Sequence, residues 1–127
     1  MRGTLNDQSL IYLQIAQMLE DNILRHIYQE GEQVPSTNEL ARSFNINPAT
    51  AAKGINLLVN DGILFKKRGV GMFVSPGARK VVQKKRQTAF YGSYIKPMIK
   101  ESASLGLTGE ELLHMVRQAI EEGEEDK

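Results

Sequence analysis

The sequence predicts an α+β fold: a helical domain that carries one two-stranded hairpin, followed by a short helical segment. Three observations between Glu32 and Ser75 support it. Two short helical segments are joined by a tight turn, the second begins at Asn47-Pro48, and a basic hairpin with glycines at its tip follows. This order is typical of a winged helix-turn-helix, whose second helix enters the major groove of DNA.

Composition sets broad limits. The chain has 127 residues, 41% of them hydrophobic, which suits one ordinary core with an appendage. It has no cysteine, which excludes disulfides and thiol chemistry and fits a reducing compartment. No apolar run has the length of a membrane span, and no signal-peptide core follows the N-terminus. We therefore expect a soluble cytoplasmic protein with no membrane partner.

Charge is distributed unevenly, although the formal net charge is only +1. The stretch from Glu121 to Asp126 is mostly acidic. A basic cluster without any acid consists of Arg79, Lys80, Lys84, Lys85 and Arg86. Such an uneven distribution of charge is more informative about binding partners than the net charge is.

The first helix is predicted from about Ser9 to Tyr28, with Gly31 as a cap at its C-terminal end. Apolar residues recur there every four positions, the period of a helix that buries one face. These residues are Ile11, Ile15, Leu19, Ile23 and Ile27.

A second helix follows Pro35. Ser36 and Glu39 have the spacing of a capping box, in which each side chain accepts a hydrogen bond from the other residue's backbone N–H. The expected buried face consists of Leu40, Ala41 and Phe44.

The third helix begins sharply after the turn at Asn45-Ile46. Asn47 is a good N-cap, and Pro48 stands at the first helical position, where its missing N–H costs nothing. The helix should run to about Asn60, with Ile55, Leu58 and Val59 facing the core.

Two short apolar segments, Ile63–Phe65 and Met72–Val74, are predicted to pair as a hairpin. Lys66–Gly71 connects them, and its alternate glycines permit positive φ and a thin turn. Pro76-Gly77 then closes the first domain, which we expect to span residues 1–77.

Residues 78–127 are predicted to form a helical dimerisation segment with an acidic tail. One helix should run from Ala78 to Ser104 with a kink or break at Pro97, and Thr108 should cap a last helix together with Glu111. Two helices are too few to enclose a core. A second subunit is the economical cover for their apolar faces, and packing back onto the first domain is the alternative.

The expected DNA surface combines a helix start, a cation and the hairpin. Backbone N–H groups from Asn47 to Thr50 would meet an anion, and Thr50 and Lys53 lie one turn apart. Lys66 adds charge at the base of the hairpin, whose tip would lie along a minor groove. The candidate DNA-binding residues are Ser36, Thr37, Asn38, Asn47, Pro48, Ala49, Thr50, Lys53, Lys67, Arg68, Gly69 and Gly71.

From about Leu10 to Ser75 the chain resembles the GntR family of bacterial transcription regulators. The matching motifs are Ile11-Tyr12-Leu13-Gln14-Ile15, Val34-Pro35-Ser36-Thr37-Asn38-Glu39-Leu40-Ala41, Leu58-Val59-Asn60-Asp61-Gly62 and Gly69-Val70-Gly71-Met72-Phe73-Val74. Many relatives carry arginine where this chain has Asn38 and Pro48, which puts the operator sequence in doubt. The short helical tail is similar to that of the YtrA subfamily. This resemblance implies a homodimeric repressor of its own operon and of an ABC-transporter operon, acting on a palindromic operator.

Other functions remain open at this point. A winged helix also serves as a protein- or RNA-interaction module, and a nucleoid protein would bind DNA without sequence preference, although the near-neutral charge argues against the latter. His26 and His114 are isolated, so neither an enzyme nor a metal site is expected, and no cofactor is implied. A small-molecule effector of unidentified kind is left open.

Overall fold

The computed structural model describes residues 8–125 and confirms a winged helix fold. The chain divides into two compact units, one ending at Lys85 and the other beginning at Arg86. The first unit thus extends past the boundary expected at residue 77. The reason is that Ala78 and Val82 belong to its core. Of the acidic tail, Asp126 lies outside the described residues, as does the N-terminal segment before residue 8.

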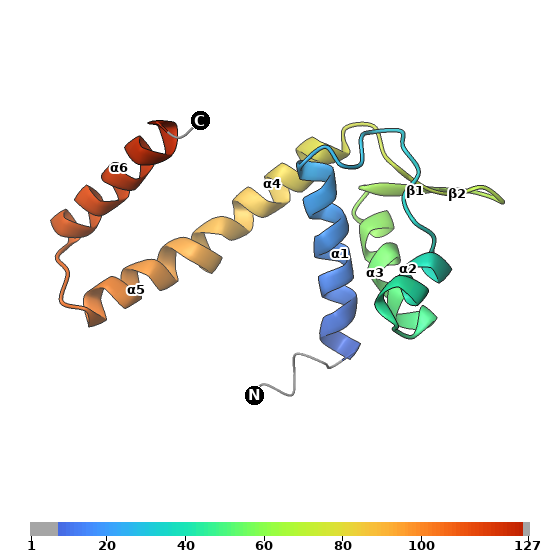
Figure 1. The fold of residues 1–127 in the computed structure, drawn as a ribbon, viewed down its shortest axis with the longest axis horizontal. Coiled ribbons are helices and arrows are strands. Elements are labelled where there is room, and N and C mark those ends of the chain that lie inside the picture. The colour runs from blue at the N-terminus through green and yellow to red at the C-terminus, as the bar shows by residue number, and fades with distance from the viewer. Residues whose placement is uncertain (1–7, 126–127) are drawn as a thin grey trace. The chain divides into compact units, whose positions relative to one another are not determined.

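The first unit contains three complete helices, one hairpin and the first part of a fourth helix (Figure 1). Its elements are α1 (Gln8–Leu24), α2 (Thr37–Phe44), α3 (Pro48–Asn60), β1 (Leu64–Lys67), β2 (Gly71–Val74) and the start of α4 (Ala78–Phe90). The antiparallel register pairs Leu64 with Val74 and Lys67 with Gly71. Gln33 adds an isolated bridge to Phe73. Both strands therefore continue further into the connecting turn than the sequence indicated.

The core lies where α1, α2, α3 and the hairpin meet. Among the described residues, every buried apolar side chain lies between Ile15 and Val82. The core members are Ile15, Ala16, Leu19, Ile23, Val34, Leu40, Ala41, Ala51, Ile55, Leu58, Ile63, Leu64, Val74, Ala78 and Val82. The four-residue apolar period of α1 is thus confirmed for Ile15, Leu19 and Ile23.

The first helix ends earlier than predicted, at Leu24 rather than near Tyr28. The N–H of His26 donates to the carbonyl of Ile23 and that of Ile27 to Asn22, while His26 has φ 63°. This is a Schellman motif with His26 in the position usually taken by glycine. The chain therefore turns before Ile27, which is 58% exposed, and Gly31 is not the cap.

The starts of α2 and α3 are as predicted. Ser36 and Glu39 form both hydrogen bonds of the capping box, and the Asn47 side chain caps α3 with Pro48 in its first turn. The prediction for Phe44 is wrong, because this side chain is 47% exposed. Left-handed Asn45 turns the chain directly after it, and Ile46 packs against the core instead.

The described part of the second unit is helical except for the turn at residues 105–108. After α4 come a π-helical turn, η2 (Tyr91–Ile95), then α5 (Lys96–Ser104) and α6 (Gly109–Glu125). The irregularity expected at Pro97 is therefore a wide turn directly before the proline, since a missing N–H and the ring disturb the preceding turn. Thr108 and Glu111 form the second capping box as predicted.

Candidate nucleic-acid interface

An open groove of about 450 Å³ runs along the exposed side of α3 beside α1. It combines two alanines with polar side chains and one cation, a composition that suits close approach to a polar surface. Its lining residues are Tyr12, Ala49, Ala52, Lys53, Asn56, Leu57 and Asn60.

The small residues of α3 serve two different purposes. Gly54 and Ala51 are buried, and a Cβ at Gly54 would lie 2.8 Å from the carbonyl oxygen of Tyr12. Gly54 therefore lets α3 approach α1 closely. Ala49 and Ala52 line the groove and keep it open. Of these small residues, only Ala49 and Ala52 leave room for another surface to approach α3 closely.

Lys53 is exposed, and its side chain lies over an aromatic ring. Its Nζ is 4.3 Å from the centroid of the Tyr12 ring, within the range of a cation–π interaction. This contact holds the ammonium at the groove instead of leaving the side chain free in solvent. Tyr12 was missed at the sequence level, because nothing in a helical apolar pattern shows which ring a lysine on another helix will reach.

The start of α3 differs from the expected anion site. The side-chain oxygen of Asn47 accepts from the N–H of Ala49 at 2.8 Å, and its carbonyl accepts from that of Thr50 at 2.9 Å. Pro48 has no N–H. The expectation of unpaired N–H groups from Asn47 to Thr50 is therefore wrong for Ala49 and Thr50, because the cap itself uses those donors.

Thr50 does not share the exposed face of Lys53. Its side chain is 7% exposed and lies on the buried side of α3, whereas Asn47, Pro48 and Ala49 are exposed. The three-residue spacing placed it near Lys53 along the axis, but α3 packs against both α1 and α2 and buries a wide sector of its surface.

At the start of α2, Ser36 is committed to its cap and Asn38 is exposed, while Thr37 is half-buried. The hydrogen bond from the backbone N–H of Ser36 lowers the pKa of Glu39 below its ordinary value, with further contributions from the Ser36 hydroxyl and Arg42. Glu39 therefore stays negatively charged and would repel a DNA phosphate bound nearby. Cations elsewhere on the surface must compensate for this repulsion.

The hairpin β1–β2, called the wing from here on, and its connecting turn carry three exposed cations. Lys66, Lys67 and Arg68 are exposed, and the Nζ of Lys67 lies 4.5 Å from the centroid of the Phe73 ring. That ring stacks on Phe65 at 5.8 Å, which stiffens the base of the hairpin.

Glycines shape the tip of the wing. Gly69 and Gly71 have φ 76° and 146°, so both need the freedom of glycine. The amide nitrogen of Gln33 donates to the carbonyl of Val70 at 3.0 Å and would meet any side chain at Gly71. Gln33 therefore supports the tip of the wing, a role that cannot be recognised from a single exposed glutamine in the sequence.

Other kinds of site find no support in the part of the chain that the structure describes. It contains no group of three or more His, Cys, Asp or Glu side chains that could hold a metal ion. In residues 8–125 no helix is both long and apolar enough to cross a membrane.

The fold and this surface define a winged-helix DNA-binding protein, and sequence comparison gives its family. The profile of the bacterial regulatory proteins of the gntR family matches residues 11–74. The chain belongs to the GntR family of bacterial regulatory proteins and carries the DNA-binding domain of that family.

Individual relatives agree with this assignment. The "Probable fructoselysine utilization operon transcriptional repressor" of Escherichia coli (strain K12) is 42% identical over 65 residues, covering 51% of this chain. This chain spans only 27% of that protein's length. The HTH-type transcriptional repressor YtrA of Bacillus subtilis (strain 168) is 29% identical over 108 residues, 85% of this chain and 82% of YtrA. The solved structure of a GntR-family regulator from Bacteroides thetaiotaomicron matches with a TM-score of 0.72, at 29% identity over 89% of this chain and 98% of that chain.

Proposed function

We propose that this protein is a repressor that binds a palindromic DNA operator as a homodimer. The groove along α3, with Lys53 held at its edge, is the observation that carries the DNA-binding surface. The wing cations Lys67 and Arg68 supply charge for phosphates. Repression rests on the names of two relatives, both called transcriptional repressors.

The surface we assign to DNA departs from the sequence-based set in two ways. Thr50 is left out because it is buried, and Tyr12, Asn56 and Asn60 are added because they line the groove. Asn56 and Asn60 carry amides, which pair with the edge of adenine in a major groove. Asn38, Asn47, Pro48 and Ala49 remain in the set. The backbone N–H of Ser36 donates to Glu39 and its hydroxyl oxygen accepts from the N–H of Glu39, so the hydroxyl proton is the donor that remains for a phosphate.

The second unit is the proposed dimer interface. Large apolar side chains are exposed along its helices, including Tyr94 at 66%, Ile99 at 53% and Leu113 at 57%. Soluble proteins rarely leave so many such residues uncovered, and a twofold copy is the commonest cover. A twofold dimer would place its two recognition helices on half-sites about 10 base pairs, or a multiple, apart.

Operon targets are a finer proposal. From the resemblance to the YtrA subfamily we propose repression of the chain's own operon and of an ABC-transporter operon; the likeness to YtrA over most of both chains supports repression alone. A regulator of bacterial operons works in the cytoplasm, and we place the protein there.

Selection of duplexes from a random DNA pool by the full chain tests the proposal. We expect a palindrome to emerge and its binding to weaken steeply with salt. A pool that stays random while RNA or a protein partner is bound would favour the interaction-module alternative. Footprinting that protects a single asymmetric half-site would contradict twofold binding.

Two single substitutions then test the surface. Lys53→Ala and Arg68→Ala should each weaken operator binding; a phosphate contact would reduce the salt slope by about one unit, whereas a base contact would cost about 1–3 kcal/mol at one position. Arg25→Ala is the matched control, because this exposed cation lies about 20 Å along α1 from Tyr12. Unchanged affinity in both test variants would remove the proposed surface.

Sedimentation tests the interface. Leu113→Asp should convert the dimer to a monomer, since it would place a charge in an apolar contact. Leu13→Asp, on an exposed leucine of the first unit, should leave the dimer intact. Equal sedimentation of both variants would contradict the interface.

A further inference from the structure

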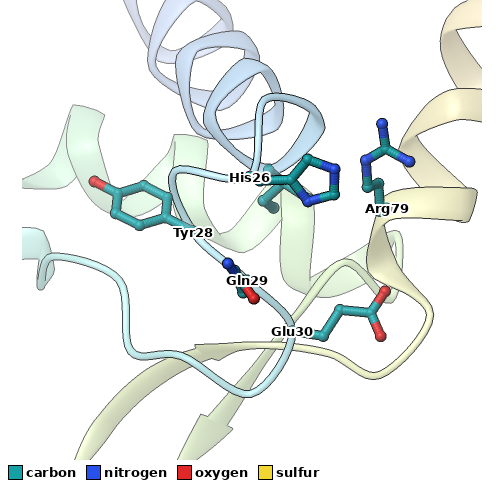
Figure 2. Close-up of a pocket in the computed structure, with 6 residues that line it drawn as sticks. His26, Tyr28, Gln29, Glu30 and Arg79 are labelled. Carbon is teal, nitrogen blue, oxygen red and sulfur yellow. The ribbon is translucent and has the colours of Figure 1, made fainter.

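A second pocket lies in the first unit, at the end of α1 and the start of α4, and shares no residue with the groove on α3 (Figure 2). Its volume is about 270 Å³, below the usual range for drug-sized ligands and suitable for a small metabolite. It is lined by Ile23, His26, Tyr28, Gln29, Glu30 and Arg79.

Two hydrogen bonds fix the walls of this pocket. Glu30 accepts from the N–H of Gly77 at 2.8 Å, which ties the loop after α1 to the start of α4. Arg79 donates through Nε to the carbonyl of Leu24 at 3.2 Å, which ties α4 back to the end of α1. Both bonds are donated by the start of α4 and accepted by the end of α1 or the loop after it, and together they hold the charged side chains in place.

The pocket is lined by a positively and a negatively charged side chain that do not pair with each other. Within the described residues no ion pair joins Arg79 to Glu30, although both line the same small space. Arg79 uses Nε for Leu24, and its guanidinium has further N–H donors. Figure 2 shows its guanidinium near the imidazole of His26, with the carboxylate of Glu30 below them in this view.

His26 occupies a conformation that costs energy. Its φ of 63° places it in the left-handed region, where glycine and asparagine are favoured. The other such non-glycine residue in the described chain is Asn45, which follows that preference. The cap at the end of α1 sets this φ, and the His26 ring lines the pocket.

We propose that this pocket binds a small zwitterion of the size of an α-amino acid. Arg79 and His26 would receive its carboxylate, and Glu30 with Gln29 would receive its ammonium group. The position also has a consequence for regulation, because a ligand held there would brace the end of α1 against the start of α4. The proposal concerns an effector and goes beyond DNA binding.

The test uses the full chain without DNA, so that its failure leaves the DNA-binding proposal untouched. The probes are the twenty common L-amino acids, added singly at millimolar concentration and followed by thermal melting and amide NMR. We expect at least one to raise Tm and to shift the amides of His26–Glu30 and Gly77–Arg79. Its amide and its N-acetyl derivative should bind about 10-fold more weakly or worse, since each lacks one charge. No response to any amino acid, or shifts confined to other regions, would overturn the proposal.

Substitutions then test the site itself. Arg79→Gln and Glu30→Gln should each lose the response, while Lys80→Gln, which changes the adjacent exposed cation, should keep it. His26→Gly should raise the ligand-free Tm because it relieves the strained φ, yet lose the ligand response. A full response in Arg79→Gln or in His26→Gly would overturn the site.

Discussion

The two units use the same local rules for building helices but differ in what covers them. The capping boxes at Ser36–Glu39 and Thr108–Glu111 have equal hydrogen-bond distances, 2.8 and 3.1 Å in each. The first unit buries its apolar residues in a core. In the described part of the second unit only Ser102 is buried, and it is polar. Caps and propensities therefore make helices in both units, whereas a core of its own exists only in the first.

This difference predicts two kinds of stability. The first unit should unfold with a free energy that does not depend on protein concentration. The second should gain stability as concentration rises, because a partner that covers its apolar side chains acts as a ligand of the folded state.

The largest effect is expected from shortening the chain. Ending it after Gly77 removes Val82 from the core and leaves the buried carboxylate of Glu20 without Lys85, a loss of about 3–5 kcal/mol in unfolding free energy. Ending it after Gln87 keeps both contacts and should leave a stable monomer. Urea unfolding and sedimentation measure this. Equal stability of the two shortened chains would place the boundary near residue 77 after all, and a dimeric chain ending at Gln87 would refute the interface.

The second-largest effect on stability is expected from glycine-to-alanine substitutions, one in a helix of each unit. Gly54→Ala should lower the stability of the first unit by about 2 kcal/mol, because the new Cβ would press on Tyr12 and Ile15. Gly123→Ala in α6 meets no atom within 4 Å and should stabilise its helix by about 0.5–1 kcal/mol. Thermal melting of both variants compares them, and a harmless Gly54→Ala would show that α3 has room to move away from α1.

Lys85 gives an effect of intermediate size. Its Nζ lies 2.6 Å from Glu20 and 2.9 Å from Asp61, and Glu20 is only 2% exposed. Lys85→Gln should cost about 1–2 kcal/mol, less than for a fully buried pair because the lysine side chain is 42% exposed. Lys80→Gln, on an exposed neighbour, should cost little.

The same lysine predicts a pH dependence. Burial disfavours its charge, but the hydrogen bonds and charges of Glu20 and Asp61 outweigh burial and raise the pKa of Lys85 above its ordinary value. Its contribution is therefore complete below the unfolded pKa of 10.5 and is lost as pH rises through the folded pKa. The stability difference between Lys80→Gln and Lys85→Gln should therefore be largest below the unfolded pKa and shrink as pH rises through the folded pKa, and a difference that grows in this range would contradict the sign.

The smallest effect compares the two caps directly. Ser36→Ala and Thr108→Ala should each cost about 1 kcal/mol. Only the loss at Thr108 should shrink at high protein concentration, because α6 belongs to the proposed interface. Melting curves over a concentration series show this, and a concentration-dependent loss at Ser36 would break the distinction between the units.

Local signals in the sequence were enough to predict much of this structure. The short-range hydrogen bonds or fixed φ of four residues set three helix starts, and all three starts are confirmed: Ser36 for α2, Asn47 with Pro48 for α3, and Thr108 for α6. Long-range contacts were not predictable in the same way.

The wrong predictions share that cause. The end of α1 depends on a histidine adopting a glycine-like φ, and the burial of Thr50 depends on how much of α3 its two neighbouring helices cover. The contacts Lys53–Tyr12 and Gln33–Val70 join residues far apart in sequence, so no local pattern contains them.

The π-helical turn Tyr91–Ile95 determines how the following helix is rotated about its own axis. A π-helical turn holds one residue more than an α-helical turn. Deleting Gly92 would let the helix close into regular α form, and each residue of an α-helix turns the chain by about 100°. Within the second unit, the face bearing Met98 and Ile99 would then rotate by that amount relative to Phe90, which precedes the turn. One residue of this turn therefore determines which apolar side chains of the second unit lie on a common face.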